Sequence, residues 1–380
     1  MLFLLVRSCQ DWLEAHGLGF LRVFTFVTFQ ATVAVVVSFL FCVLLGGRVI
    51  DWLRRNKLGD LASFDQADLD EMMRNKKGTP TMGGVLIIAA ILVTTLLLAD
   101  LRNFYVLMGI VAVTGCGLIG AFDDWMKLTA GRREGSRQGL EGPEKLVGQI
   151  GLGAILSYFT YRHGAANPVA HQLFLPFLKD PVTTLSLGLF VLLGVVTLTG
   201  FSNAVNLSDG LDGLAGGCTA IVSFVFLILA LLSGISPLGQ YLKLPVVPAS
   251  DQMAVLAGAM LGACLGFLWF NCNPARVFMG DTGSLALGGL IAYIAIVIRH
   301  EFTLVLVGGV FVAEAVSVVI QRYYFKATRR IYGEGRRFFL MAPIHHHFQR
   351  KGWTETQVVV RFWLIGAMLA AMAIATVKLR

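Results

Sequence analysis

Charged side chains are scarce in this sequence. Asp, Glu, Lys and Arg make up 14% of its 380 residues, whereas soluble domains carry about 25%. Hydrophobic residues make up 56%, and the mean hydropathy is +0.73. This composition excludes an ordinary soluble domain. It predicts an all-α integral membrane protein that crosses the bilayer several times.

The sequence also lacks a C-x-x-C pair, and we expect no cleavable leader at its start. The six cysteines form no C-x-x-C pair and mostly lie in apolar segments, so they are predicted to be small core residues and not a disulfide or zinc framework. The apolar run from Met1 to Val6 is too short for a signal sequence, and no A-x-A site follows it. We therefore expect this segment to be retained, and we assign no role to residues 1–19.

Long apolar segments are what the sequence has instead. A bilayer core of about 30 Å predicts ten membrane spans within one catalytic domain, residues 1–380. They cover residues 22–46, 82–98, 104–121, 146–161, 184–200, 214–234, 252–270, 284–298, 303–321 and 356–377. An even number of spans places both termini on the same side of the membrane.

The distribution of basic residues predicts which side that is. Five loops, at 47–81, 122–145, 201–213, 271–283 and 322–355, contain 7, 5, 0, 1 and 8 Lys or Arg residues, and the rest of the chain contains 10. By the positive-inside rule these loops are cytoplasmic and both termini are periplasmic. The net charge of +8 is then explained by topology, and we expect no nucleic-acid partner.

Acidic residues gather where apolar segments meet these cytoplasmic loops. They are Asp123, Asp124, Asp209, Asp212 and Asp281. A carboxylate beside hydrocarbon is costly and is usually functional, and several together bind a divalent cation and, through it, phosphate. Any one of them is equally well explained as a helix cap. Their common membrane face favours a metal-dependent site for the set.

Basic residues near the acids suit an anionic substrate. Lys76 precedes a Gly/Pro-rich turn that contains Thr81 and leads into a span, where exposed N–H groups bind anions; a simple interfacial anchor is the alternative. Lys127 follows Asp123 by four residues and Asp124 by three, so all three share one helix face. We predict that Lys127 contacts the substrate.

Aromatic and polar residues complete the candidate set. Phe278 is the aromatic residue nearest Asp281 and would stack on a base or anchor the interface. His345, His346 and His347 cannot converge on one zinc ion, so they suit phosphate contacts or proton transfer. Glu314, Ser317 and Gln321 form a polar stripe that we expect to face the bundle and border a lipid groove.

These features together predict phosphoryl transfer between a soluble nucleotide and a lipid phosphate, a reaction that depends on positioning and charge neutralisation. Five strings in matching order then resemble the phospho-N-acetylmuramoyl-pentapeptide transferase family. They are KKGTPTMGG (76–84), FDDWMK (122–127), NAVNLSDGLDGLA (203–215), NPARVFMGDTGSLALGG (273–289) and MAPIHHHFQRKGW (341–353).

The resemblance implies a ten-helix, homodimeric enzyme of the bacterial inner membrane. It would transfer phospho-N-acetylmuramoyl-pentapeptide from its UDP carrier to undecaprenyl phosphate, releasing UMP and forming lipid I for peptidoglycan synthesis. The cofactor would be Mg²⁺, with Asp281 as its ligand and Asp123 and Asp124 close by. Asp123 resembles the family's base or nucleophile, and Asp124, Asp281 and His345 complete the predicted catalytic set.

Further residues resemble the family's substrate-binding positions. They are Lys76, Thr81, Asn206, Asp209, Gly210, Leu211, Asp212, Asn271, Phe278, Gln321, His346 and His347. The chain departs from the family between Lys127 and Lys145, where it reads LTAGRREGSRQGLEGPE. Lys145 therefore receives no assigned role.

Alternatives remain at two levels. Asp123 either keeps the lipid phosphate deprotonated for direct attack on the β-phosphorus, or forms an aspartyl-phosphate intermediate. A related transferase specific for N-acetylglucosamine would share the Asp loops, although the MAPIHHHF string favours the muramoyl substrate. A secondary transporter would place its ionisable residues at mid-membrane in repeated, broken helices, whereas these acids lie at one face.

Overall fold

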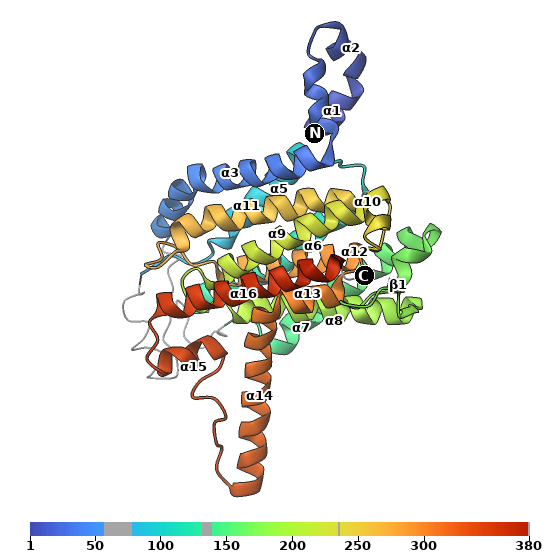
Figure 1. Cartoon of the computed structure of the whole chain (residues 1–380). Coiled ribbons are helices and arrows are strands. Elements are labelled where there is room, and N and C mark those ends of the chain that lie inside the picture. The colour runs from blue at the N-terminus through green and yellow to red at the C-terminus, as the bar shows by residue number, and fades with distance from the viewer. Residues whose placement is uncertain (57–77, 131–138, 235, 379–380) are drawn as a thin grey trace.

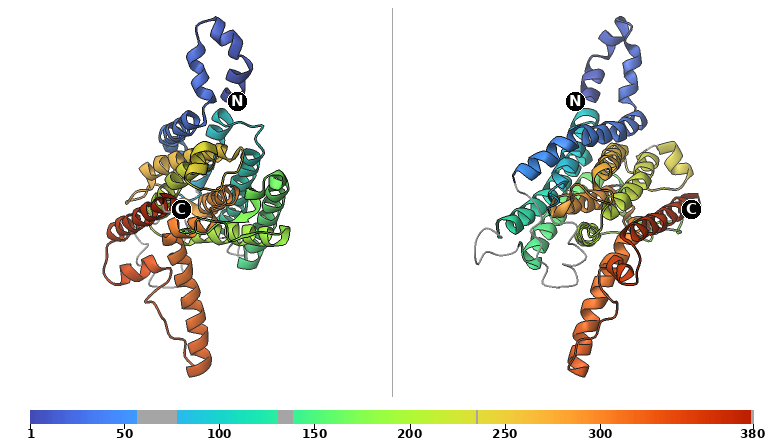
Figure 2. Two further views of the ribbon diagram at one scale, coloured as in Figure 1. Left: turned by 45° about the vertical axis from the view of Figure 1, so that its right-hand side comes forward. Right: turned by 90° about the vertical axis from the view of Figure 1, so that its left-hand side faces the viewer.

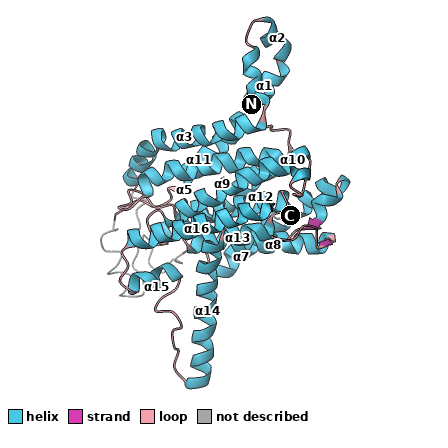
Figure 3. Ribbon diagram, in the orientation of Figure 1, coloured by secondary structure: helices cyan, strands magenta, loops and turns pink. Residues whose placement is uncertain are grey.

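Helices dominate the computed structural model, which describes residues 1–56, 78–130, 139–234 and 236–378 (Figure 3). The long helices are α3 (Val27–Arg55), α5 (Gly84–Leu98), α6 (Phe104–Ala130), α7 (Gly142–His163), α8 (Leu187–Leu207), α9 (Leu214–Gly234), α11 (Met253–Asn271), α12 (Gly280–Val297), α14 (Gly309–Tyr332) and α16 (Glu355–Lys378). Each of the ten predicted apolar segments coincides with a helix or, once, with a pair of helices.

Short elements connect and flank the long helices. They are α1 (Leu2–Ser8), α2 (Gln10–Ala15), η1 (Gly19–Thr25), η3 (Gly164–Ala166), η4 (Pro168–His171), α10 (Ser236–Tyr241), η5 (Ser250–Gln252), α13 (Glu301–Val307) and α15 (Ile344–Arg350). Strands β1 (Gln172–Leu173) and β2 (Thr183–Thr184) form one antiparallel pair, with Gln172 opposite Thr184.

Among the residues that the structure describes, seven helices are long and apolar enough to cross a bilayer: α3, α6, α8, α9, α11 (counted from Ser250), α12 and α16. The pair α13 and α14 makes an eighth if it counts as one span. At 15 residues α5 is shorter, and α7 is not among the seven. The structure thus supports seven or eight spans by length and composition, fewer than the ten predicted.

Several predicted ends of the membrane spans are wrong, because the sequence shows neither a bend within an apolar segment nor the continuation of a helix beyond it. The predicted span 303–321 is not one straight helix, because α13 and α14 meet at Gly308 with a bend of 84°. Amphipathic sequence carries α14 on to Tyr332, into the predicted loop 322–355. In the same way α6 continues to Ala130, beyond the predicted end of its span at residue 121, and it carries Asp123, Asp124 and Lys127 on the helix that their spacing predicted.

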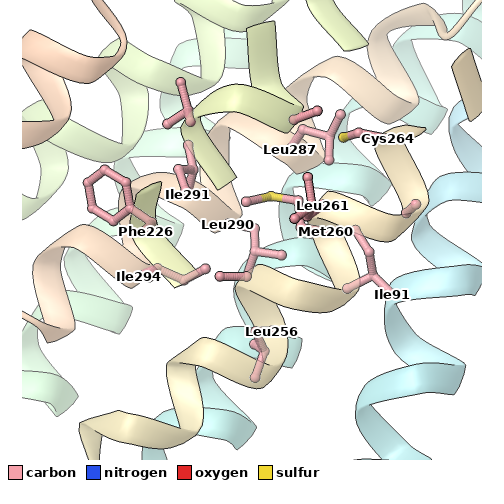
Figure 4. Packing of buried hydrophobic residues seen from close by; sticks show 14 of the residues in the cluster. Ile91, Phe226, Leu256, Met260, Leu261, Cys264, Leu287, Leu290, Ile291 and Ile294 are labelled. Atoms are coloured by element: carbon pink, nitrogen blue, oxygen red, sulfur yellow. The ribbon is translucent and has the colours of Figure 1, made fainter. Parts of the chain in front are cut away.

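Helices α11 and α12 form the core. In an apolar stretch of 18 residues, 83% of the residues are buried in α11 and 89% in α12. The corresponding values are 28% for α3 and 33% for α16. Helix α11 packs against α3, α5 and α9, while α12 packs against α6 and α8. Figure 4 shows Leu256 and Met260 of α11 beside Leu290 and Ile294 of α12. The lower burial of α3 and α16 places them in the outer layer of the bundle.

Small residues allow the closest helix contact. A Cβ added at Gly258, Gly262 or Gly266 of α11 would collide with the backbone of α3. Such a four-residue repeat of glycine lets two membrane helices approach closely, and dispersion contacts then hold them together. Four of the six cysteines, Cys42, Cys116, Cys218 and Cys264, are buried and free, as expected for small core residues.

Two parts extend away from this bundle. Figure 1 shows α3, α9, α11 and α16 running side by side, with α14 leaving on one side and α1 and α2 on the opposite side. Both further views agree (Figure 2). The bend at Gly308 therefore directs α14 out of the bundle. Helix α15, which carries the three histidines, packs against α14.

Candidate active site

Three carboxylates from two helices meet at one end of the bundle. Asp123 and Asp124 lie near the end of α6, and Asp281 lies in the first turn of α12. One oxygen from each falls within 4.8 Å of the others. The convergence of acids distant in the sequence, which was expected, is thus present in the fold. Asp123 and Asp124 are buried, and Asp281 is partly accessible.

Glycines make this approach possible. A Cβ at Gly120 of α6 would collide with the backbone carbonyl of Asp281, and one at Gly84 of α5 would collide with Gly283 of α12. Gly280 has a φ of +71°, in the left-handed region that favours glycine. A side chain there would also come within 2.7 Å of Asp124 Oδ2 and 3.1 Å of Thr81 Oγ1.

Two lysines bridge the acids. Lys127 Nζ lies 2.7 Å from Asp123 Oδ2 and 3.0 Å from Asp281 Oδ2. Lys145, in the first turn of α7, lies 2.9 Å and 2.6 Å from the same two oxygens. Sequence reasoning missed Lys145, because the unusual loop before it hid its position.

Asp124 has a different set of partners from Asp123. Its carboxylate accepts hydrogen bonds from the backbone N–H of Asp281 (3.2 Å), the N–H of Thr282 (2.9 Å) and the hydroxyl of Thr282 (2.6 Å). These donors belong to the first turn of α12, whose N–H groups have no partner within the helix. Asp124 therefore caps α12 from the side and holds Asp281 in place.

Asp123 is held by the segment between α6 and α7. Its Oδ1 accepts a hydrogen bond of 2.7 Å from the backbone N–H of Leu140. The two lysines contact its other oxygen, Oδ2. Because Oδ1 is engaged by the backbone, Oδ2 is the oxygen directed toward Asp281 and the shared ammonium groups.

The end of α8 adds neutral and acidic groups. Asn206 Nδ2 donates to Asp281 Oδ1 at 2.8 Å and to Ser284 Oγ at 3.0 Å. Asp209 accepts a hydrogen bond from the backbone N–H of Gly280. Burial, together with the nearby charges of Asp281 and Asp124, raises the pKa of the Asp209 carboxyl well above its usual range.

Two other predicted residues, Asp212 and Asn271, form hydrogen bonds with the loop next to the acidic cluster. Asp212 Oδ2 accepts from Asn273 Nδ2 at 3.1 Å and from the backbone N–H of Ala275 at 3.0 Å. Asn271 accepts from the N–H of Gly213 and donates to the carbonyl of Val277. These bonds secure residues 272–277 in front of α12. Leu211 is buried in the core, next to Asp212.

The segment that carries Thr81 lies against Phe278. The N–H of Phe278 donates to the carbonyl of Pro80, and its own carbonyl accepts from the N–H of Gly83, both at 2.8 Å. Thr81 is close to Gly280, as described above. Lys76 lies outside the residues that the structure describes.

Gln321 lies on α14, and the three histidines lie on α15, which packs against it. Gln321 accepts hydrogen bonds from the backbone N–H groups of Phe338 and Phe339. His347 Nδ1 accepts from the N–H of Leu340, and His346 Nδ1 lies 2.8 Å from Gln349 Oε1. His345 is completely buried and contacts Glu314. Glu314 and Ser317 are buried against the bundle, as the polar stripe predicted.

The cluster has the chemistry of an oxyanion and cation site. Three carboxylates offer only oxygen donors, which suit a hard divalent cation. Two ammonium groups beside them suit phosphate oxygens, because they compensate negative charge at short range. All of these groups sit at the ends of helices, unlike the mid-membrane acids of a transporter.

Comparison with known proteins agrees with this chemistry. Residues 104–299 match the family model described as glycosyl transferase family 4. Residues 76–88 match signature 1 of phospho-N-acetylmuramoyl-pentapeptide-transferase. The first match covers α6 to α12 and thus all three clustered carboxylates.

Curated relatives extend the likeness to the whole chain. A phospho-N-acetylmuramoyl-pentapeptide-transferase of Thermodesulfovibrio yellowstonii is 42% identical, with 100% of both chains covered. One from Desulfotalea psychrophila is 44% identical over 94% of this chain and 96% of its own, and one from Chloroherpeton thalassium is 40% identical over 100% of both. Since such identity spans nearly the full length, the chain belongs to the phospho-N-acetylmuramoyl-pentapeptide-transferase family.

Proposed function

We propose that this protein transfers phospho-N-acetylmuramoyl-pentapeptide from UDP-N-acetylmuramoyl-pentapeptide to undecaprenyl phosphate, forming lipid I and releasing UMP for peptidoglycan synthesis. Family membership supports the choice of substrates. The observation that carries the chemistry is the pair Asp123 and Asp281, bridged by Lys127 and Lys145. This group suits a reaction in which a diphosphate is held and its charge is balanced.

The acidic residues fit Mg²⁺. Asp281 would hold it, with Asp123 close by, while Asp124 is engaged with the first turn of α12. When bound, the ion would neutralise charge on the diphosphate and on the departing UMP. Asp281 is suited to the role of main ligand because Asn206 orients its Oδ1.

Other groups of the chain would handle the phosphates and the proton. Lys127 and Lys145 bind phosphate oxygens, since each carries three donors and contacts both acids. Asp123 Oδ2 accepts the proton of the lipid phosphate. The deprotonated phosphate oxygen then attacks the β-phosphorus directly, and UMP leaves. The alternative is attack by Asp123 itself. The two ammonium contacts stabilise the ionised carboxylate and reduce its strength as a base and as a nucleophile alike, so trapping a phosphorylated enzyme is the observation that would favour the second route.

The same proposal includes the membrane arrangement. Ten spans, periplasmic termini and a cytoplasmic active site in the bacterial inner membrane follow from the positive-inside rule, since five loops contain 21 of the 31 basic residues. The long helices supply ten candidate segments, with α5, α7 and the bent pair α13 and α14 as the shorter, more polar or broken ones. A homodimer in contact with membrane lipid completes the proposal.

A reconstitution assay tests the proposed reaction. Purified protein in detergent is incubated with UDP-N-acetylmuramoyl-pentapeptide, undecaprenyl phosphate and Mg²⁺, and release of UMP is followed. We expect turnover that stops when EDTA removes the metal and that falls at least about 100-fold in Asp281→Asn. UDP-N-acetylglucosamine serves as the rival donor. Turnover of UDP-N-acetylglucosamine without turnover of UDP-N-acetylmuramoyl-pentapeptide would refute the proposal, and so would undiminished turnover in EDTA.

A further inference from the structure

His345 and Glu314 form a buried pair between α15 and α14. His345 Nδ1 lies 3.1 Å from Glu314 Oε2, and the backbone N–H of His345 points to the same oxygen at 3.4 Å. Both side chains are completely buried, with 0% exposure. Two contacts from one residue to one carboxylate oxygen fix the start of α15 against α14.

The opposite edge of the imidazole faces the loop that follows α8. A Cβ added at Gly210 would come within 2.5 Å of His345 Nε2 and 2.9 Å of its Cε1. The ring of His346 lies 4.1 Å away, centroid to centroid. The ring of His345 therefore fills the space between Glu314 and Gly210 and has no surface open to a substrate.

The loop against which His345 packs leads directly to the acidic cluster. Asp209 precedes Gly210 and accepts a hydrogen bond from the N–H of Gly280, next to Asp281. Asn206, at the end of α8, donates to Asp281 Oδ1. A displacement of the ring would thus shift residues that orient Asp281. Small displacements matter here, since about 1 Å of misplacement costs on the order of 100-fold in rate.

We propose that His345 is a positioning residue and not the acid or base of the reaction, and that Glu314 orients it. Glu314 Oε2 lies 3.1 Å from Nδ1 and accepts a hydrogen bond from the backbone N–H of His345, and these two contacts set the orientation of the ring. The ring then holds the 208–211 loop, and through it Asp281, at a set distance from α14. This inference rests on the proposed function.

Two substitutions of His345 separate positioning from proton transfer. Asn places an amide near the position of the imidazole Nδ1 but does not titrate, so His345→Asn retains a polar contact with Glu314 and part of the volume of the ring. We expect kcat of this variant to stay within about 10-fold of the parent, whereas His345→Ala loses about 100-fold or more. An acid or base would lose on the order of 100-fold to 10,000-fold in both variants. Equal losses in Asn and Ala would overturn the proposal.

Glu314 provides a matched pair. Glu314→Gln keeps an oxygen acceptor of the same reach, while Glu314→Leu fills the space without one. We expect Gln to rescue most of the kcat that Leu loses, with KM for the nucleotide substrate rising in Leu alone. The double variant Glu314→Leu, His345→Ala should be no worse than His345→Ala, because both act through one contact.

Gly210 gives a test that holds even if a His345 variant is poorly stable. Gly210→Ala places a methyl group against the ring, so it should cost about 10-fold or more in the parent. In the His345→Ala background the methyl group has room, and the added cost should fall to about 2-fold. A cost that is the same in both backgrounds would contradict the proposal. UMP release by the parent protein checks the proposed function separately, and thermal denaturation checks folding.

Discussion

Lys145 Nζ lies 2.6 Å from Asp281 Oδ2 and so joins the first turn of α7 to the first turn of α12. The same ammonium lies 2.9 Å from Asp123. Three helices thus meet at one cation. Lys127 reaches the same two oxygens, but from a more open position, with 46% of its side chain exposed compared with 16% for Lys145.

Replacing each lysine by methionine should reveal this difference. Lys145→Met leaves two partly enclosed carboxylates without their better-buried cation, and we expect kcat to fall on the order of 100-fold to 1,000-fold. Lys127→Met should cost about 10-fold, because water and salt screen the more exposed group. Turnover of UDP-N-acetylmuramoyl-pentapeptide measures both. A larger loss in Lys127→Met would show that exposure does not rank the two lysines.

Thr282 tests the capping role of Asp124. Thr282→Val removes the 2.6 Å hydroxyl donor to Asp124, so we expect stability to fall by about 1.5–3 kcal/mol, as for hydrogen bonds to charged groups. Activity should fall about 10-fold as Asp281 becomes less well placed. Thr219→Val on α9 is the control, because within the described part of the chain its buried hydroxyl has no hydrogen-bond partner. If the two variants melt at the same temperature, the cap contributes nothing.

Gly120 tests the close approach of α6 to the start of α12. Gly120→Ala forces a methyl group onto the carbonyl of Asp281, so we expect a loss of activity of at least about 100-fold and a lower melting temperature. Gly151→Ala on α7 is the matched change, since nothing lies within 4 Å of its added Cβ. There alanine should leave activity unchanged and raise stability by about 0.5–1 kcal/mol. Full activity of Gly120→Ala would disprove the close contact.

Asp209 should make stability depend on pH. Its pKa is raised well above the usual range, first by burial and then by Asp281 and Asp124. The folded state therefore binds a proton that the unfolded state has lost, and this contribution disappears as pH rises through the folded pKa. Asp209→Asn cannot lose that proton. The melting temperature of the variant, relative to the parent in EDTA, should therefore be higher at pH 8 than at pH 5.

The control for this pH dependence is Asp51→Asn, on an exposed position of α3. The melting-temperature difference between that variant and the parent should be nearly the same at both pH values. A difference for Asp209→Asn that shrinks as pH rises would mean that the carboxyl is stabilised in its ionised form.

Much of this fold could be predicted from the sequence, because lipid and core both demand apolar segments. Each of the ten predicted segments coincides with a helix or a helix pair. The bend at Gly308 was not predicted, since an apolar segment looks the same whether it is straight or broken. The end of α14 was also missed, because its amphipathic turns continue the helix beyond its apolar part, to Tyr332.

The site could be predicted only in part. Conspicuous acids in polar strings led to Asp123, Asp124 and Asp281, and the structure brings them together. Lys145 was missed because an ordinary lysine after an atypical loop carries no signal of its own. Asp212 and Asn271, which were predicted to contact substrate, have backbone and loop partners that no motif reveals. Such partners depend on how two loops fold against each other.

The deep burial of α12 has a mechanical consequence for Asp281. Asp281 lies at the start of the most enclosed of the seven apolar helices found among the described residues, so its backbone has little room to move and its neighbours set only the fine orientation of its side chain. Adjustment during a catalytic cycle therefore falls to the long, rotatable lysine side chains and to the incoming phosphates. The reacting molecules must come to a stationary carboxylate, and the accuracy of their alignment is set by the interior of the bundle.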